Sequence, residues 1–417
     1  MLKEALRRLG KDSLIYGLGG AISKCIGLLL LPLYTNALSP KEYGITALLS
    51  LLGVLMNGIL TLGTGNSMGL LYFKETNLGK RPKIIWTNFT LMLSNGLLWY
   101  SLICFFSSNI SYLMFQTNEY HNFIKLSFLT TVLTVITDPW LAYLRMERKA
   151  KIYLYLTLTG IAVNVALSFV LVILFKLGVY GLLLSGATGA CIYVFLAWIF
   201  VGRKINFQLD KNLILPLIRI GFPSIFGVFA FLVVDYADRL MIERYIGLTQ
   251  LGLYSVAYSF GLVVLVGLTA FGNAWPPFFM SYVNKQNEAK EVFGKVLTYY
   301  LLCFGSLVVL FFCVAKPLLQ AVANPVYLEA WRVVGFIAGA YALKGCYLIM
   351  LPGIYFNNKL YLQSGIEWIA AILNIFLNIY LNQIIISITF VIYLCILYFF
   401  LMKPFERNYV INIFKHE

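Results

Sequence analysis

Residues 177–201 decide the fold class, and they read LGVYGLLLSGATGACIYVFLAWIFV without one charged side chain. A helix needs about 20 apolar residues to cross the roughly 30 Å of hydrocarbon in a bilayer. A strand of a membrane barrel would instead alternate apolar and polar residues, and this stretch does not alternate. Because only helices and closed barrels satisfy the backbone in lipid, the stretch predicts a transmembrane helix.

Apolar runs of the same kind extend along the whole chain and predict about twelve spans. The predicted spans are 14–36, 44–71, 84–107, 122–144, 152–175, 177–201, 214–236, 250–274, 292–315, 333–356, 361–382 and 384–402. The sequence is 60% hydrophobic and 12% charged, with a mean hydropathy of +0.83, whereas soluble domains carry about 25% charged residues. We therefore expect an all-α membrane protein without a soluble domain of any size.

The basic residues between the runs predict the orientation of the chain. When the connections are assigned alternately to the two sides of the membrane, one side receives 22 Lys and Arg residues and the other receives 6. Cytoplasmic connections are the basic ones, so twelve spans with both termini in the cytoplasm are predicted. The formal net charge is +15, but its spread over short clusters argues against nucleic-acid binding.

Motifs of soluble enzymes and of metal sites are missing from the sequence. The seven cysteines lie singly within apolar runs and far from both histidines, which predicts neither a disulfide framework nor a metal site. There is no P-loop, HExxH or nucleophile elbow, which disfavours an ATP-driven pump. The short connections leave no room for a catalytic domain, so we expect a transporter without a cofactor, whose coupling ion, H+ or Na+, stays open.

Two pairs of short motifs suggest an internal duplication. Leu38-Ser-Pro-Lys-Glu-Tyr-Gly44 corresponds to Ile246-Gly-Leu-Thr-Gln-Leu-Gly252, and Gly65-Asn66 corresponds to Gly272-Asn273, at nearly equal offsets. With six spans in each half, the repeat is parallel. We therefore predict two six-helix lobes, residues 1–205 and 206–417, with substrate in a central cavity between them, as in transporters of this plan.

Charged residues inside the predicted spans are the candidate functional groups, because each costs about 2.5–3.5 kcal/mol at the centre of a membrane helix on insertion scales. The basic candidates suit an anionic ligand such as a phosphate or pyrophosphate. They are Lys24, Lys125, Arg219 and Lys344. The candidates for ion coupling or charge balance are Asp138, Asp235, Asp238, Arg239 and Glu367.

Each candidate has a structural alternative. Lys125, Arg219 and Glu367 lie near predicted span ends, from which such side chains reach the interface. Asp238 and Arg239 could cap the seventh helix and pair locally. Asp138 precedes Pro139, which frees a backbone carbonyl, and its carboxylate could bind a cation or proton or neutralise a lysine.

Several of these stretches resemble bacterial polysaccharide flippases of the Wzx type. The resemblance rests on Gly27-Leu-Leu-Leu-Leu-Pro32 and on Leu38–Gly44, on Gly221-Phe-Pro223 leading to Asp238-Arg239, on Leu251-Gly-Leu-Tyr-Ser-Val-Ala-Tyr258, on Arg145, and on Leu177-Gly-Val-Tyr-Gly181. It covers most of the chain through short, diffuse motifs. It places the chain in the multidrug/oligosaccharidyl-lipid/polysaccharide exporter (MOP) superfamily.

The resemblance implies alternating access for an undecaprenyl-diphosphate-linked oligosaccharide, moved between the leaflets of the bacterial cytoplasmic membrane. Lys24 matches a basic lumen residue of the family's first helix, which is thought to meet the diphosphate. Peptidoglycan lipid II flippases of this superfamily usually have fourteen spans, so twelve favour an O-antigen (lipopolysaccharide), capsule or exopolysaccharide unit. Polysaccharide polymerase machinery is a further partner to consider, and a monomer is the default because two lobes supply the cavity.

Two other functions compete with this one. A drug/cation antiporter of the same superfamily would need an acidic, aromatic cavity, whereas basic residues outnumber acidic ones in these spans. A membrane-embedded polysaccharide polymerase or ligase usually carries a large periplasmic loop, and the sequence has none.

Overall fold

The computed structural model is almost entirely helical over the residues that it describes. These are residue 27 and residues 30–147, 149–280, 282, 286–356 and 360–380. Within them, eight helices are long and apolar enough to cross a membrane, which confirms a multi-pass helical membrane protein. Most of the predicted first span and all of the twelfth lie outside the described residues, so the number twelve stays a prediction.

The chain divides into two compact units. Among the described residues, unit 1 comprises residues 37–232, and unit 2 comprises those of 27–36 and 233–380. The boundary between them falls inside one helix, α9 (Ile214–Ile246), whose first part packs in unit 1 and whose last part packs in unit 2. The division into lobes at residues 205 and 206, and the internal repeat, stay predictions.

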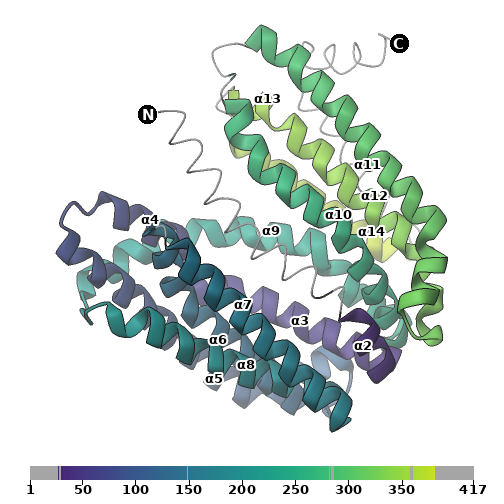
Figure 1. The fold of residues 1–417 in the computed structure, drawn as a ribbon, viewed down its shortest axis with the longest axis horizontal. Helices are drawn as coiled ribbons and strands as arrows, with labels where there is room; N and C mark the ends of the chain where they lie inside the picture. Colours follow the sequence, from purple (N-terminus) through teal and green to yellow (C-terminus); the bar gives the residue numbers. More distant parts are fainter. Residues whose placement is uncertain are drawn as a thin grey trace. The chain divides into compact units, whose positions relative to one another are not determined.

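Unit 1 is a bundle in which α6 is central, because α3, α5 and α8 all pack against it (Figure 1). α7 packs against α8. The helices of this unit are α3 (Pro40–Thr61), α4 (Thr64–Lys74), α5 (Arg81–Phe115), α6 (His121–Met146), α7 (Ala150–Ser168, continued by a π-helical segment Phe169–Leu174), α8 (Gly178–Phe200) and the first part of α9.

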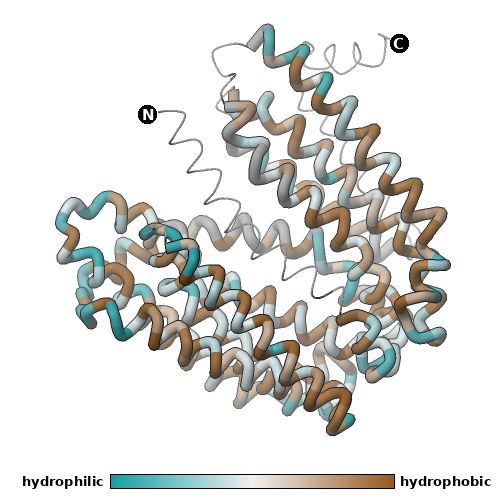
Figure 2. The backbone as a smooth tube through the Cα atoms, viewed as in Figure 1, coloured by the Kyte–Doolittle hydropathy of each residue, from teal (hydrophilic) through white to brown (hydrophobic). Residues whose placement is uncertain are grey.

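Unit 2 is built around α12, which packs against both α10 and α11 (Figure 1). Its described helices are α2 (Leu31–Ala37), the last part of α9, α10 (Leu248–Met280), α11 (Gln286–Val322), a 3-10 turn (Pro325–Ala330), α12 (Trp331–Met350), α13 (Pro352–Phe356) and α14 (Leu360–Tyr380). Hydrophobic residues cover most of the length of the long helices in each unit, and hydrophilic residues gather near helix ends and turns (Figure 2).

The motif Leu38–Gly44 starts α3 through a capping box. The Ser39 hydroxyl accepts a hydrogen bond from the Glu42 backbone N–H at 3.3 Å, and a Glu42 carboxylate oxygen accepts one from the Ser39 N–H at 2.8 Å. Pro40 takes the first helical position, where its missing N–H costs nothing. The corresponding motif 246–252 also spans a helix-to-helix turn, since α9 ends at Ile246 and α10 begins at Leu248.

The second predicted span is broken in its middle. Leu62 and Gly63 adopt left-handed backbone angles, with φ of 51° and 65°, and separate α3 from α4. The Asn95 amide donates to the carbonyl oxygens of Ile59 at 3.1 Å and Leu60 at 3.0 Å, and the Ile59 carbonyl also accepts from the Leu62 N–H at the end of α3. The expectation of one unbroken helix over 44–71 was therefore wrong, because hydropathy does not register a glycine that turns the backbone.

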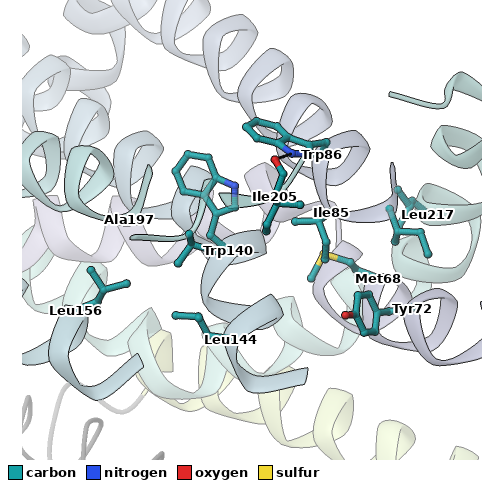
Figure 3. Packing of buried hydrophobic residues seen from close by; sticks show 12 residues of the cluster. Met68, Tyr72, Ile85, Trp86, Trp140, Leu144, Leu156, Ala197, Ile205 and Leu217 are labelled. Atoms are coloured by element: carbon teal, nitrogen blue, oxygen red, sulfur yellow. Dashed lines mark hydrogen bonds between the residues drawn. The ribbon is translucent and has the colours of Figure 1, made fainter. Parts of the chain in front are cut away.

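A hydrophobic cluster that includes Trp86 and Trp140 packs the start of α9 against other helices of unit 1 (Figure 3). The Trp86 indole donates to the Ile205 carbonyl at 3.1 Å, and the Phe89 ring stacks on Trp140 with centroids 4.5 Å apart. Leu217 of α9 is fully buried in this cluster. The first part of α9 is thereby fixed to unit 1 by apolar packing.

Candidate functional site

The last part of α9 carries three charged residues on one face. Asp235, Asp238 and Arg239 are three and four positions apart, a spacing that places side chains on one side of a helix. They lie inside the helix, because α9 continues to Ile246 and ends where Gly247 takes a φ of +104°. The predicted end at residue 236 was wrong, and Asp238 and Arg239 do not cap this helix.

Lys344 of α12 forms an ion pair with Asp235 of α9. The Lys344 ammonium lies 3.1 Å from each carboxylate oxygen of Asp235. The two side chains are 24% and 20% exposed, so the pair is mostly removed from solvent. A predicted anion-binding candidate and a predicted charge-balancing candidate therefore occupy one site, and they offset each other's charge.

Asp238 is the most deeply buried of these charged residues, with 5% of its surface exposed. One carboxylate oxygen accepts a hydrogen bond from the Arg239 backbone N–H at 2.8 Å, and the other accepts one from the Tyr254 hydroxyl. Hydrogen bonding of this kind offsets part of the cost of burying a carboxylate. Asp238 is thus held by a backbone group and a hydroxyl.

Arg239 is surrounded by tyrosine rings. Its guanidinium carbon lies 4.7 Å from the centroid of the Tyr236 ring and 4.7 Å from that of Tyr258, and each such contact stabilises a cation by about 0.5–2 kcal/mol. The Arg239 Nε is buried and has no hydrogen-bond partner among the described residues. Leaving a buried donor unpaired costs about 1–3 kcal/mol, and more for a charged group, so the position is costly unless something else binds there.

Glu367 of α14 joins unit 2 through hydrogen bonds from uncharged groups. The Tyr347 hydroxyl donates to Glu367 Oε1 at 3.2 Å and the Gln363 amide donates to the same oxygen at 3.1 Å. Glu367 is half-buried. It is therefore directed toward neighbouring polar side chains rather than left fully exposed at a helix end.

The candidates in unit 1 are not brought together with one another. Lys125 and Asp138 lie on α6 and are half-buried, whereas Arg219 lies near the start of α9 and is exposed. None of the three has an ion pair in the part of the chain that the structure describes; the charge of Arg145 acts on Asp138 from the end of the same helix. Lys24 lies outside the described residues.

The tyrosines around Arg239 and Asp238 are the site residues that sequence reasoning missed. Tyr254 and Tyr258 lie one turn apart on α10, and Tyr258 packs edge-on against Tyr341 of α12 with centroids 5.8 Å apart. The sequence does contain a pattern that could have identified them, because two tyrosines four residues apart lie on one face of an otherwise apolar helix. Only the helix packing shows that this face meets Asp238 and Arg239.

A second polar cluster, at one end of unit 1, also escaped the sequence analysis. The Tyr72 hydroxyl donates to the Glu147 carboxylate, and the Arg81 guanidinium lies 4.9 Å from the centre of the Tyr72 ring. Burial, together with the bond to Glu147, raises the pKa of Tyr72, so its hydroxyl stays protonated and able to donate at neutral pH. The cluster connects the end of α4, the start of α5 and the end of α6.

Comparison with known proteins gives one family and one fold. The model of a family described as polysaccharide biosynthesis protein matches residues 36–332. An inward-facing multidrug resistance MATE family transporter of the MOP superfamily superposes with a TM-score of 0.73, at 12% identity over 95% of this chain and 99% of that one. The lipid II flippase MurJ, in an inward closed conformation, gives 0.71 at 14% identity over 97% and 92%.

A third structure is a MOP superfamily transporter from Pyrococcus furiosus, reported with a binding pocket of reverse polarity. It gives a TM-score of 0.65 at 13% identity, over 99% of this chain and 94% of that one. No curated protein matches the sequence. These structural likenesses establish the fold, which this chain shares with transporters of the MOP superfamily, and the family match agrees with the resemblance to polysaccharide flippases that the sequence motifs suggested.

Proposed function

Since the chain belongs to the polysaccharide biosynthesis protein family, we propose that it is a flippase that moves undecaprenyl-diphosphate-linked polysaccharide repeat units across the cytoplasmic membrane by alternating access. The observation that carries the proposal is the polar cluster of unit 2, formed by Asp235, Asp238, Arg239, Tyr254, Tyr258 and Lys344. Its two cations, Arg239 and Lys344, lie on helices that are otherwise mainly apolar. Cationic groups inside membrane helices are costly and mark a path for polar substrates.

The chemistry of such a substrate matches a transporter without covalent machinery. A diphosphate and its sugars cannot cross hydrocarbon unaided, whereas a polyprenyl chain remains in the lipid. The protein therefore has to supply only a polar, cationic environment and a change of access. Carboxylates and tyrosines beside the cations add hydrogen-bonding groups for sugars.

The candidate residues take two proposed roles. Lys24, Lys125, Arg219 and Lys344 are proposed to meet the diphosphate, and Asp138, Asp235, Asp238, Arg239 and Glu367 to balance charge or couple transport to an ion. The ion pair to Lys344 supports the charge-balancing role of Asp235. An arriving anion would compete with Asp235 for the same ammonium group.

The remaining features of the proposal follow from the sequence. We place the chain in the bacterial cytoplasmic membrane with both termini cytoplasmic, as a monomer of twelve helices in two lobes. The cargo is a repeat unit of O-antigen, capsule or exopolysaccharide, handed on to polymerase machinery. The coupling ion is H+ or Na+.

Deletion of the gene in its host tests the proposed function. Lipid-linked repeat units are expected to accumulate and surface polysaccharide to disappear, and the wild-type chain restores both. An Arg332→Gln variant, which changes only one partner of an exposed ion pair with Glu329, should restore both in the deletion strain as the wild type does. It serves as the control for variants of the site. Unchanged surface polysaccharide in the deletion strain would contradict the proposal.

Ion coupling is tested at Asp138, which is half-buried beside Pro139 in α6. If this carboxylate carries the coupling ion, Asp138→Asn makes transport independent of the ion gradient in reconstituted vesicles. Transport that follows the gradient as in the wild type would assign Asp138 to charge balance instead.

A cation or drug antiporter is the second candidate function, and one observation favours it. In unit 2, Asp235 and Asp238 lie on α9 with Tyr254 bound to Asp238, and a third carboxylate, Glu367 of α14, accepts from Tyr347. Acidic and aromatic groups suit organic cations. Increased sensitivity of the deletion strain to cationic dyes, with surface polysaccharide intact, would support this function over the flippase.

A further inference from the structure

We propose that Arg239, beyond the charge-balancing role given to it above, joins Lys344 in binding a phosphate-type oxyanion in unit 2, and that Tyr254 keeps Arg239 available by holding Asp238 away from it. The identity of the anion as a lipid-borne diphosphate rests on the proposed function. The assignment of Arg239 itself rests on the contacts around it.

The two basic residues of the polar cluster differ in how they are engaged. Lys344 is within 3.1 Å of both carboxylate oxygens of Asp235. Arg239 makes no ion pair within the described part of the chain, and its Nε is buried without a hydrogen-bond partner there. An anion that enters the cluster therefore has to displace a carboxylate to reach Lys344, but not to reach Arg239.

The neighbouring carboxylate is kept from neutralising Arg239. Asp238 is the next residue in the chain, yet its two oxygens accept from the Arg239 backbone N–H and from the Tyr254 hydroxyl. Tyr254 is buried on α10 and brings this hydroxyl from a different helix. Its bond directs Asp238 toward α10, and the Asp238 carboxylate forms no ion pair with the guanidinium among the described residues.

The tyrosine rings position the Arg239 guanidinium but do not supply the oxygen acceptors that an oxyanion would supply. A cation–π contact stabilises a guanidinium without providing an oxygen acceptor for its N–H groups, which match two oxygens of a phosphate. Tyr236 and Tyr258 each lie 4.7 Å from the guanidinium carbon, and the side chain as a whole is only half-buried. The planar group is thus held by two rings while its Nε donor has no hydrogen-bond partner among the described residues.

The binding test uses the purified full-length protein in detergent, with farnesyl diphosphate and inorganic pyrophosphate as probes and farnesol as the control lipid. We expect binding of both diphosphates and not of farnesol. Arg239→Gln should raise the Kd for farnesyl diphosphate by about tenfold or more, because a bidentate charge-assisted contact is lost. Tighter binding of farnesyl diphosphate than of pyrophosphate would assign the site to a lipid-borne anion.

Three further variants separate binding from folding. Arg239→Lys keeps the positive charge but not the planar fork, so the Kd should rise by a smaller factor than in Arg239→Gln. Tyr254→Phe releases Asp238 without removing a cation, and it should also weaken diphosphate binding. Arg332→Gln should leave the Kd unchanged, because its exposed pair lies at the start of α12.

The outcomes distinguish this inference from the proposed function. Wild-type affinity in well-folded Arg239→Gln and Arg239→Lys proteins, or no diphosphate binding by the wild type, would overturn the assignment of Arg239. Normal surface polysaccharide in a strain that carries only Arg239→Gln would also overturn it, while leaving the flippase function intact. Arg239-dependent binding in a protein whose deletion spares surface polysaccharide would refute the flippase function alone.

Discussion

Replacing Lys344 by methionine tests whether the ion pair to Asp235 stabilises unit 2. Methionine keeps most of the side-chain length but leaves the Asp235 carboxylate, 20% exposed, without the ammonium group 3.1 Å away. Breaking a fully buried pair costs about 3–5 kcal/mol, whereas an exposed pair contributes about 0–1 kcal/mol. For this mostly buried pair we expect a loss of about 2 kcal/mol in the free energy of unfolding.

The partner substitution should recover most of that loss. Asp235→Asn alone leaves a partly buried ammonium group, and we expect it to cost about 1–2 kcal/mol. In the double variant neither group is charged, so we expect it to lie within about 1 kcal/mol of the wild type. The coupling between the two sites is then about 2–4 kcal/mol.

Denaturant unfolding of the four purified proteins in one detergent measures this coupling. A double variant whose loss equals the sum of the single losses, within about 0.5 kcal/mol, would refute the reasoning. Lys295→Met serves as the control, because its pair with Glu291 is exposed on both sides, at 66% and 74%. It should change stability by less than about 1 kcal/mol.

Three further predictions concern unit 1, each measured as thermal stability of the purified protein. Gly63→Ala should cost about 2 kcal/mol or more, because Gly63 has φ +65° and an added Cβ would collide with the Gly221 carbonyl. The control Gly65→Ala should be neutral or stabilising, because a Cβ added there meets no atom of another residue within 4 Å. Equal effects of the two substitutions would contradict this prediction. Asn95→Ala should cost about 1–3 kcal/mol by removing the hydrogen bonds to two carbonyls, of which Ile59 keeps the bond from the Leu62 N–H, and an unchanged melting temperature would contradict it. Tyr72→Phe should cost about 1–2 kcal/mol through the lost bond to Glu147; no loss would show that water replaces that bond.

Hydropathy predicted where helices lie better than where they end. The run at 84–107 is part of a helix that extends from Arg81 to Phe115, and the run at 292–315 is part of one from Gln286 to Val322. The length of an apolar run reflects the thickness of the hydrocarbon core, whereas a helix can continue beyond the membrane until a residue interrupts it. For the same reason the predicted span ended at residue 236, ten residues before α9 ends at Ile246. No glycine or proline lies between residue 236 and Gly247, so nothing there interrupts the helix.

The sequence identified charged residues of the site but not their partners. Lys344 was singled out because a lysine inside a span needs a polar neighbour. Its partner Asp235 is 109 residues away in the chain, and only the packing of helices decides which of several carboxylates it meets. The same packing directs Tyr254 to Asp238 and Tyr258 to Arg239, which no spacing within one helix encodes.

Transport by the purified protein in proteoliposomes tests the central claim most directly. The measurement follows a fluorescent undecaprenyl-diphosphate-linked oligosaccharide from one leaflet to the other, with protein-free liposomes as the blank. The account predicts protein-dependent translocation that Arg239→Gln abolishes or slows by about tenfold or more and that Arg332→Gln leaves unchanged. Translocation no faster than in the blank, in vesicles that do carry a cationic dye across, would contradict it.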